Sequence, residues 1–258
     1  MDDSLHLIDG APHLIDGAPH LIDGAPHLRD GSLQAILMDL DGTLVDTEQY
    51  WIAAEYALVA EHGGTWSDEH ARAIVGNALL TAADYLRAHG GVDLPSARIV
   101  EILSDTVAGA LGRRVPWRPG ARELLAAARG EGIPCALVTM SYSELARAVI
   151  DRLPGATFGA VVTGDEVRYG KPHPEPYLTA AERLGVDPRA CLAIEDSPTG
   201  IASAESAGCA VLAVPNQVPI ERAGSRVVRP SLAGLDVAGL RAVFAVAARA
   251  RPSRSPAA

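Results

Sequence analysis

Short apolar runs alternate with Ala- and Leu-rich stretches along most of the chain after Gln34. The runs have the length of buried strands and the stretches repeat apolar residues at helical spacing, which is typical of a parallel sheet covered by helices on both faces. Strands are predicted at residues 35–38, 135–138, 160–162, 191–194 and 210–214. Helices that cover them are predicted at residues 121–129, 143–153, 174–184, 199–207 and 235–249. The pattern therefore predicts an α/β fold with a doubly wound, Rossmann-like parallel sheet.

The segment between the first predicted strand and the next strand–helix unit spans about seventy residues, which is too long for a simple connection. Its apolar positions recur at helical spacing and predict helices at residues 48–61, 68–75, 78–88 and 96–111. An all-helical insertion of this kind can close over a site and exclude water. We therefore expect a core at residues 32–47 and 115–250 and an inserted all-helical cap domain at residues 48–114.

The N-terminal region repeats a heptapeptide, His-Leu-Ile-Asp-Gly-Ala-Pro, which starts at His6, His13 and His20 and degenerates after His27. Gly and Pro in every repeat prevent a continuous helix, and each repeat is too short to bury a face of its own. Residues 1–31 are therefore expected to form a flexible arm and residues 251–258 a flexible tail. Weak metal binding by the repeated histidines stays an alternative.

The composition limits the kinds of partner. Apolar residues make up 48% of the 258 residues, which is ample for a buried core. The net charge of -10 argues against a general binder of nucleic acids or membrane surfaces, which would need clustered Lys and Arg. An anionic ligand would then be held by local devices, such as a metal ion, Lys171 or a helix N-terminus.

Cysteine usage and the start of the chain bear on the compartment. Cys135, Cys191 and Cys209 are odd in number, far apart and set among small apolar residues, which favours buried thiols in a reducing compartment over a disulfide or a metal site. Met1-Asp2-Asp3 lacks the regions of a secretory signal, and no apolar run reaches the length of a membrane span. A cytoplasmic location is expected, and the sequence does not indicate an oligomeric state.

Polar side chains gather at the carboxyl ends of four predicted strands. They belong to Asp39, Asp41, Thr43, Thr139, Ser141, Lys171, Glu195 and Asp196. Carboxyl ends of parallel strands meet at one edge of a sheet, so these groups are expected to converge. One carboxylate can attack phosphorus while a second handles the proton of the leaving group. Clustered carboxylates need a divalent metal and a lysine to stay ionised, so the sequence predicts a site for phosphoryl transfer.

The chain resembles the haloacid dehalogenase superfamily through four motifs in the family's order: Asp39-Leu-Asp41-Gly-Thr43, Thr139, Lys171-Pro172 and Glu195-Asp196-Ser197. The resemblance spans about residues 34–248. It is to the subgroup whose helical cap follows the first motif, alongside phosphoglycolate phosphatases, sugar phosphatases and β-phosphoglucomutase.

The resemblance implies a role for each motif residue. Asp39 would be the nucleophile that forms an aspartyl-phosphate, and Asp41 would protonate the leaving oxygen and then deprotonate the attacking water. Thr43 would orient Asp41, and Lys171 would neutralise charge on Asp39 and on the phosphoryl group. The residues expected to contact the transferring phosphoryl group are Thr139, Met140, Ser141 and Lys171.

The resemblance also implies a magnesium ion. Its ligands would be the Asp39 carboxylate, the Asp41 backbone carbonyl and Asp196, with water and phosphoryl oxygens completing an octahedron. Glu195 would support these ligands from beside the metal, with direct binding to the ion as the alternative.

The choice of reaction depends on three positions. Asp41 favours phosphate esters, because members that displace halide or cleave phosphonates lack this acid. Trp51 and Leu79 stand where the mutase has a histidine and an arginine. We therefore predict a Mg²⁺-dependent phosphatase that hydrolyses a small phosphorylated metabolite, of the sugar phosphate or phosphoglycolate type. A phosphomutase and a non-catalytic phosphate-binding or interaction protein stay as alternatives.

Contacts from the predicted cap are less defined. Asn77, Arg72 and Tyr85 could meet a substrate or could be surface or packing positions. The hinge at residues 46–48 is expected to cap the first cap helix, with direct contact to a substrate as the alternative. The tryptophans, including Trp51, are expected to pack within the cap.

Overall fold

The computed structural model describes residues 31–224 and 226–250, so the predicted tail and almost all of the predicted arm lie outside the described residues. Six parallel strands form one sheet in the order β3-β2-β1-β4-β5-β6. The strands are β1 Ala35–Met38, β2 Cys135–Val138, β3 Ala160–Val162, β4 Cys191–Glu195, β5 Ala210–Ala213 and β6 Arg226–Val228. The predicted doubly wound α/β class is confirmed.

The centre of the sheet is β1, and the strand order reverses there. Met38 pairs with Leu137 of β2 on one side and with Ile194 of β4 on the other. The chain thus winds outward in both directions from β1, and a crevice forms where the two halves part at the carboxyl ends. The residues that follow β1, β2 and β4 meet at this crevice.

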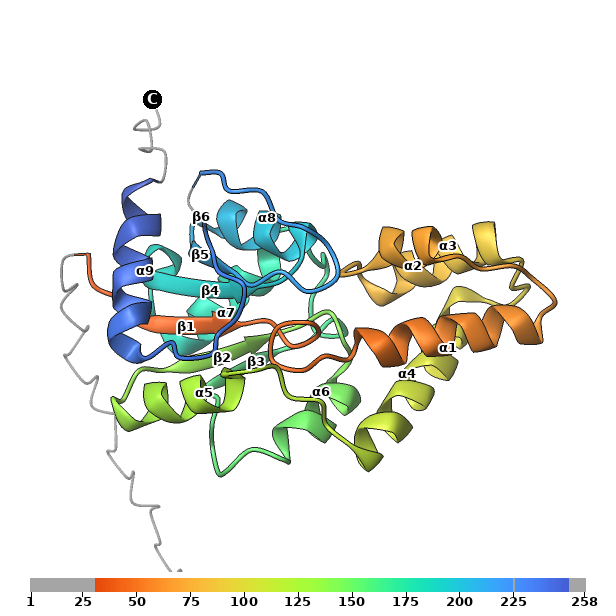
Figure 1. Cartoon of the computed structure of the whole chain (residues 1–258), viewed down its shortest axis with the longest axis horizontal. Coiled ribbons are helices and arrows are strands. Elements are labelled where there is room, and N and C mark those ends of the chain that lie inside the picture. The colour runs from red at the N-terminus through yellow and green to blue at the C-terminus, as the bar shows by residue number, and fades with distance from the viewer. Residues whose placement is uncertain (1–30, 225, 251–258) are drawn as a thin grey trace, which may run out of the picture. The chain divides into compact units, whose positions relative to one another are not determined.

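Alternate residues of each strand face opposite layers of helices (Figure 1). Ile36 and Met38 belong to the apolar cluster that includes α5 (Ala121–Gly130), α6 (Ser143–Ile150) and α9 (Val237–Arg249). Ala35 and Leu37 belong to the cluster that includes α7 (Glu175–Leu184) and α8 (Pro198–Ala207). Burial on both faces explains why the strands are continuous apolar runs rather than alternating ones.

Helices occupy most of the stretch between the loop after β1 and α5. They are α1 Glu48–Glu61, α2 Asp68–Ile74, α3 Leu79–Gly90 and α4 Ser96–Arg113. Figure 1 shows them beyond the carboxyl ends of the strands. α4 packs against α1 and α3 and also against α6 of the sheet layers. These helices therefore stand over the crevice without being separate from the core.

The sequence missed β6, which pairs in parallel with β5. Its residues, Arg226–Val228, are only partly buried and are too few to give a periodic signal. The Arg226 guanidinium donates to both carboxylate oxygens of Glu205 on α8, so the strand is held by a polar contact that apolar patterning cannot indicate.

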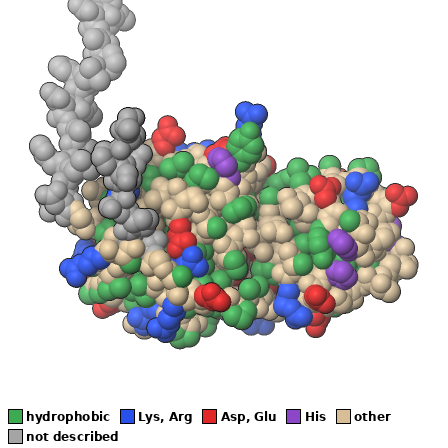
Figure 2. All heavy atoms as spheres, turned by 90° about the horizontal axis from the view of Figure 1, so that it is seen from above, with side chains coloured by type: hydrophobic (Ala, Val, Ile, Leu, Met, Phe, Trp, Pro, Cys, Tyr) green, Lys and Arg blue, Asp and Glu red, His purple; other side chains and the backbone are tan. Residues whose placement is uncertain are grey.

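The described helices do not include one with the length and apolar character needed to cross a membrane. On the face shown in Figure 2, acidic and basic side chains lie interspersed.

The predicted burial of the thiols is confirmed. Cys135, Cys191 and Cys209 are buried and belong to no disulfide among the described residues, and burial raises the pKa of the Cys135 thiol to about 12. We expect alkylation of the native protein near pH 8 to be at least about a hundredfold slower than alkylation of the unfolded chain, because reaction requires opening of the core. Counting modified thiols by mass spectrometry with and without urea tests this. Rapid labelling of the native protein would contradict the burial.

Candidate active site

The ammonium of Lys171 joins two carboxylates at the carboxyl end of the sheet. It donates to Asp39 Oδ1 at 2.7 Å and to Glu195 Oε1 at 2.6 Å. A third hydrogen bond runs to the carbonyl oxygen of Val138, the last residue of β2, at 2.9 Å. The Lys171 side chain is only 3% exposed, so solvent screens this network weakly. Three strands and the loop after β3 are thereby tied together at one point.

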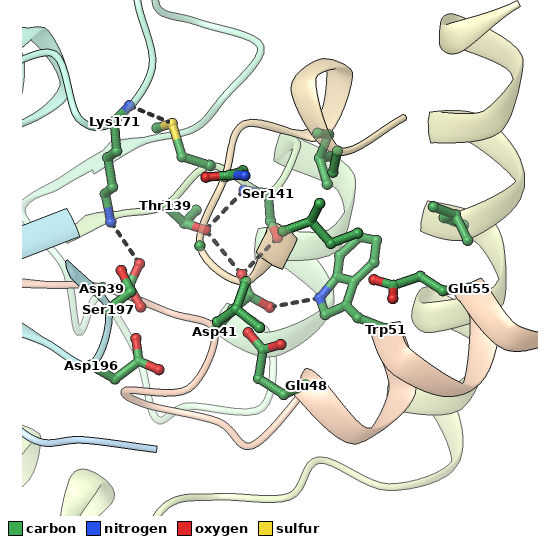
Figure 3. Close-up of a pocket in the computed structure, with 18 of the residues that line it drawn as sticks. Asp39, Asp41, Glu48, Trp51, Glu55, Thr139, Ser141, Lys171, Asp196 and Ser197 are labelled. Atoms are coloured by element: carbon green, nitrogen blue, oxygen red, sulfur yellow. Dashed lines mark hydrogen bonds and ion pairs between the residues drawn. The ribbon is translucent and has the colours of Figure 1, made fainter. Parts of the chain in front are cut away.

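The carboxylate of Asp41, two residues after Asp39, is held from two sides. Thr47 Oγ1 and Trp51 Nε1 donate to its Oδ1 at 2.5 and 3.2 Å. Ser141 Oγ and Thr139 Oγ1 donate to its Oδ2 at 2.7 and 3.2 Å. Asp41 therefore links the loop after β1 with α1 and with the loop after β2, as Figure 3 shows.

The resemblance implied that Thr43 orients Asp41, but the structure shows no hydrogen bond between them. Its hydroxyl is buried and has no hydrogen-bond partner among the described residues. The turn at Gly42, with φ of +84°, is closed by backbone bonds from Leu44 and Val45 to Leu40, and the Asp41 carboxylate is satisfied from α1 and the β2 loop instead. Thr47 orients Asp41, and for that reason its side chain does not cap α1 as expected.

Three buried carboxylates, of Asp39, Glu195 and Asp196, bring one oxygen each within 4.8 Å of one another. Asp39 Oδ2 and Asp196 Oδ2 are buried with no hydrogen-bond partner among the described residues. Gly42 permits this approach, because a Cβ there would lie 2.1 Å from Asp196 Oδ2. Hard carboxylate oxygens lacking donors are what Mg²⁺ prefers, so the donor set fits that ion.

Burial is the largest influence on the pKa values of the clustered carboxyl groups. Desolvation raises the pKa of Asp39 to about 7, against the lowering effect of Lys171. Desolvation and the neighbouring charge of Asp39 raise the pKa of Asp196 well above its usual range. Asp39 and Glu195 hold the pKa of Lys171 above its usual value despite burial. One ammonium is therefore too little positive charge for the carboxylates around it.

Both carboxylate oxygens of Glu195 accept hydrogen bonds from protein groups. Besides Lys171, its Oε1 accepts from the Tyr177 hydroxyl at 2.7 Å, and its Oε2 accepts from Ser197 Oγ at 3.3 Å. Its carboxylate also lies against Gly200, where a Cβ would come within 1.9 Å of Oε1. These contacts fix Glu195 behind Lys171. Tyr177 was not among the predicted site residues, because its place in α7 reads as a core position.

A cavity lies between this edge of the sheet and the helices α1–α4. Its sheet side carries Asp39, Asp41, Thr139, Met140, Ser141, Lys171, Asp196 and Ser197. Its helical side includes Glu48, Trp51 and Glu55 of α1, together with apolar residues of α2, α3 and α4. The predicted site residues other than Thr43 and Glu195 therefore open onto one space.

Of the helical residues considered for substrate contact, some line the cavity and others do not. Asn77 and Leu79 line the cavity, whereas Arg72 is exposed and does not line it. Tyr85 packs edge-on against Trp66 and contacts the ring of His89. Met140 lines the cavity, and its sulfur accepts from the backbone N–H of Lys171 at 3.2 Å.

Three cavity residues on α1 were not among the predicted site residues. Trp51 was assigned to packing, yet its indole N–H binds Asp41. Glu48 and Glu55 are each only 6% exposed, and burial raises the pKa of Glu48 to about 8 and that of Glu55 to about 7. Their spacing at 48, 51 and 55 is the available signal, since it puts all three on one face of a helix.

Known proteins are similar to this chain in sequence and in fold. Protein CbbY of Rhodobacter capsulatus is 33% identical over 213 residues, which cover 72% of this chain and 86% of that protein. Hexitol phosphatase A of Escherichia coli is 33% identical over 197 residues, which cover 70% of this chain and 82% of that protein. The solved structure of a CbbY mutant from Rhodobacter sphaeroides in complex with xylulose-(1,5)-bisphosphate matches with a TM-score of 0.73 at 28% identity, covering 81% of this chain and 99% of that one.

A family model described as haloacid dehalogenase-like hydrolase matches residues 33–208, which extend from just before β1 to just past α8. This span contains the three residues of the carboxylate cluster and Lys171. The family expected from the motifs is thus confirmed, and the chain belongs to the haloacid dehalogenase-like hydrolases.

Proposed function

We propose that this protein is a Mg²⁺-dependent phosphatase that hydrolyses a small phosphate monoester of the sugar phosphate type through an aspartyl-phosphate. The observation that carries the proposal is the pairing of Asp39 with Lys171 on one side of the crevice and Asp41 on the other. A nucleophile, a neutralising cation and a separately held acid are the groups that phosphoryl transfer to a carboxylate requires. Names of relatives such as hexitol phosphatase A support this reaction.

In the first half-reaction, a carboxylate oxygen of Asp39 forms a bond to phosphorus while the bond from phosphorus to the ester oxygen breaks. Asp41 gives its proton to the departing oxygen, so an alcohol leaves and Asp41 becomes a carboxylate. The four donors around Asp41 hold that carboxylate in place. Lys171 offsets negative charge on Asp39 during attack.

In the second half-reaction, Asp41 takes a proton from water, which attacks phosphorus as the bond to Asp39 breaks. Inorganic phosphate leaves, and both carboxyl groups return to their first states. We propose that Thr139, Ser141 and the backbone at Met140 contact the phosphoryl oxygens, because these residues line the cavity next to Asp41.

Asp39 and Asp196 would hold Mg²⁺ through their unpartnered oxygens, with the Asp41 carbonyl as a further ligand. When bound, the ion neutralises charge on the carboxylates and the phosphoryl group. Glu195 would support the site through Lys171 and Tyr177 instead of binding the ion, since its oxygens already accept hydrogen bonds.

Helices α1–α4 would act as the cap over the site. The turn between α2 and α3 approaches the core so closely that a Cβ at Gly76 would lie 2.8 Å from Ser197 Cβ. Contact at this point covers the cavity and would keep bulk water from the aspartyl-phosphate. A mutase is not favoured, because Trp51 fills the position of the mutase histidine and its indole binds Asp41.

Replacing the nucleophile tests the proposal directly. We expect Asp39→Asn to lower phosphate release from an aryl phosphate by at least about a thousandfold, because the amide cannot attack phosphorus. The matched control is Asp93→Asn, which changes an exposed aspartate away from the cavity. Circular dichroism would show that both variants fold. Full activity in the Asp39 variant would refute the nucleophile assignment.

The metal assignment has a second readout besides turnover. We expect Mg²⁺ to raise the Tm of the chelator-treated protein by about 5 °C or more at saturation, since it binds buried carboxylates of the folded state only. Asp196→Asn should reduce that rise and Asp93→Asn should not. Turnover should stop with chelator and return with Mg²⁺. Turnover that persists in chelator would exclude a required metal.

Trp51 is proposed to position Asp41. Trp51→Phe keeps an aromatic ring but removes the donor to Asp41 Oδ1, so we expect kcat to fall about tenfold with a smaller change in KM. Trp117→Phe is the control, because Trp117 lies outside the cavity beside Arg122. If both variants retain wild-type kcat at unchanged Tm, the other three donors suffice to orient Asp41.

A further inference from the structure

The wall of the cavity that α1 provides is acidic. Glu48 and Glu55 lie seven residues apart on α1, which is two helical turns, with Trp51 between them. Both carboxyl groups line the cavity and each residue is 6% exposed. In Figure 3 the Glu48 carboxyl group points toward Asp41, and that of Glu55 lies beside the Trp51 ring.

These carboxyl groups have few protein partners. No donor among the described residues bonds to Glu48, and Glu55 accepts a hydrogen bond from Trp66 Nε1 at 3.1 Å. Burial of an acceptor without a donor costs stability. A ligand that brings donors would satisfy these oxygens.

Positive charge is scarce on the described lining of the cavity. Lys171 is its one basic residue, and its ammonium is already bound to Asp39 and Glu195. The remainder of the helical wall includes the apolar side chains of Ile74, Leu79, Val100 and Leu103. A second anionic group on the substrate would therefore lie in an apolar wall next to two acids. If Glu48 and Glu55 were protonated, this second anionic group would still have no positive charge beside it.

We propose that Glu48 and Glu55 select phosphate monoesters whose leaving group carries hydrogen-bond donors, as hydroxyl or ammonium groups, and no second anion. This inference rests on the proposed phosphatase function and narrows it. It excludes phosphoglycolate, which carries a carboxylate, and bisphosphates such as the xylulose-(1,5)-bisphosphate bound to the CbbY structure of Rhodobacter sphaeroides. A polyol or amino-alcohol phosphate fits the wall.

The test compares kcat/KM for substrates that differ in the leaving group. The panel is a hexitol phosphate, phosphoethanolamine, phosphoglycolate, xylulose-(1,5)-bisphosphate and an aryl phosphate, all with Mg²⁺. We expect one or both of the first two to exceed phosphoglycolate and the bisphosphate by at least about tenfold, the scale of one net hydrogen bond. The order of the first two distinguishes hydroxyl from ammonium donors.

Variants then connect the preference to the two residues. Glu48→Gln and Glu55→Gln should each lower the kcat/KM ratio of the preferred substrate to phosphoglycolate by about tenfold. A ratio is insensitive to the fraction of protein that folds, because both substrates meet the same enzyme. Gln at position 55 keeps an acceptor for Trp66. Glu61→Gln, at the exposed end of α1, makes the same charge change away from the cavity and should leave the ratio as in the wild type.

The outcomes separate this inference from the function it rests on. Absence of aryl phosphate hydrolysis by the folded wild-type protein would overturn the phosphatase proposal itself. Hydrolysis of the aryl phosphate together with a preference for phosphoglycolate or the bisphosphate would overturn the role of the acidic wall alone. A ratio that neither Gln variant changes would overturn it as well, even if the wild-type preference is as expected.

Discussion

The buried ammonium of Lys171 is the interaction on which the site depends. It is the common partner of Asp39 after β1 and Glu195 at the end of β4, and it also binds the last carbonyl of β2. Removing it would leave buried carboxylates without compensation, a situation that costs several kcal/mol, roughly 3–5 for a broken buried pair. The sheet can end in a cluster of acids only because this side chain reaches it from the loop after β3.

The sheet topology makes that reach possible. Since β1 is central and the order reverses there, its carboxyl end borders both β2 and β4, and three loops converge without any long-range distortion. Gly42 brings the turn after Asp41 against Asp196, and Gly200 brings α8 against Glu195. The backbone packs closely against these carboxylates and excludes water from their oxygens. Burial is therefore the main cause of the raised pKa values of Asp39 and Asp196.

The sequence predicted what depends on strand ends and missed what depends on contacts between segments. Asp39, Lys171 and Asp196 follow apolar runs, and the geometry of parallel sheets brings such ends together without further information. The Thr43 hydroxyl has no hydrogen-bond partner among the described residues, because the tight turn sets the direction of its side chain, and Thr47 donates to Asp41. The roles of Trp51 and Glu55 depend on where α1 faces, and a helix with apolar residues on several sides gives little indication of that.

Charge divides the cavity into two functional sides. On the sheet side, unpartnered carboxylate oxygens and Lys171 suit a metal ion and one phosphoryl group. On the helical side, Glu48 and Glu55 face the space that the rest of a substrate would occupy. A protein of net charge -10 gains little from long-range attraction of phosphate, so it must recognise its ligand at short range. The sheet side can then bind a phosphate while the helical side rejects a second anion. The two sides lie close together, but low-dielectric surroundings strengthen the interaction of each charge with its nearest neighbours.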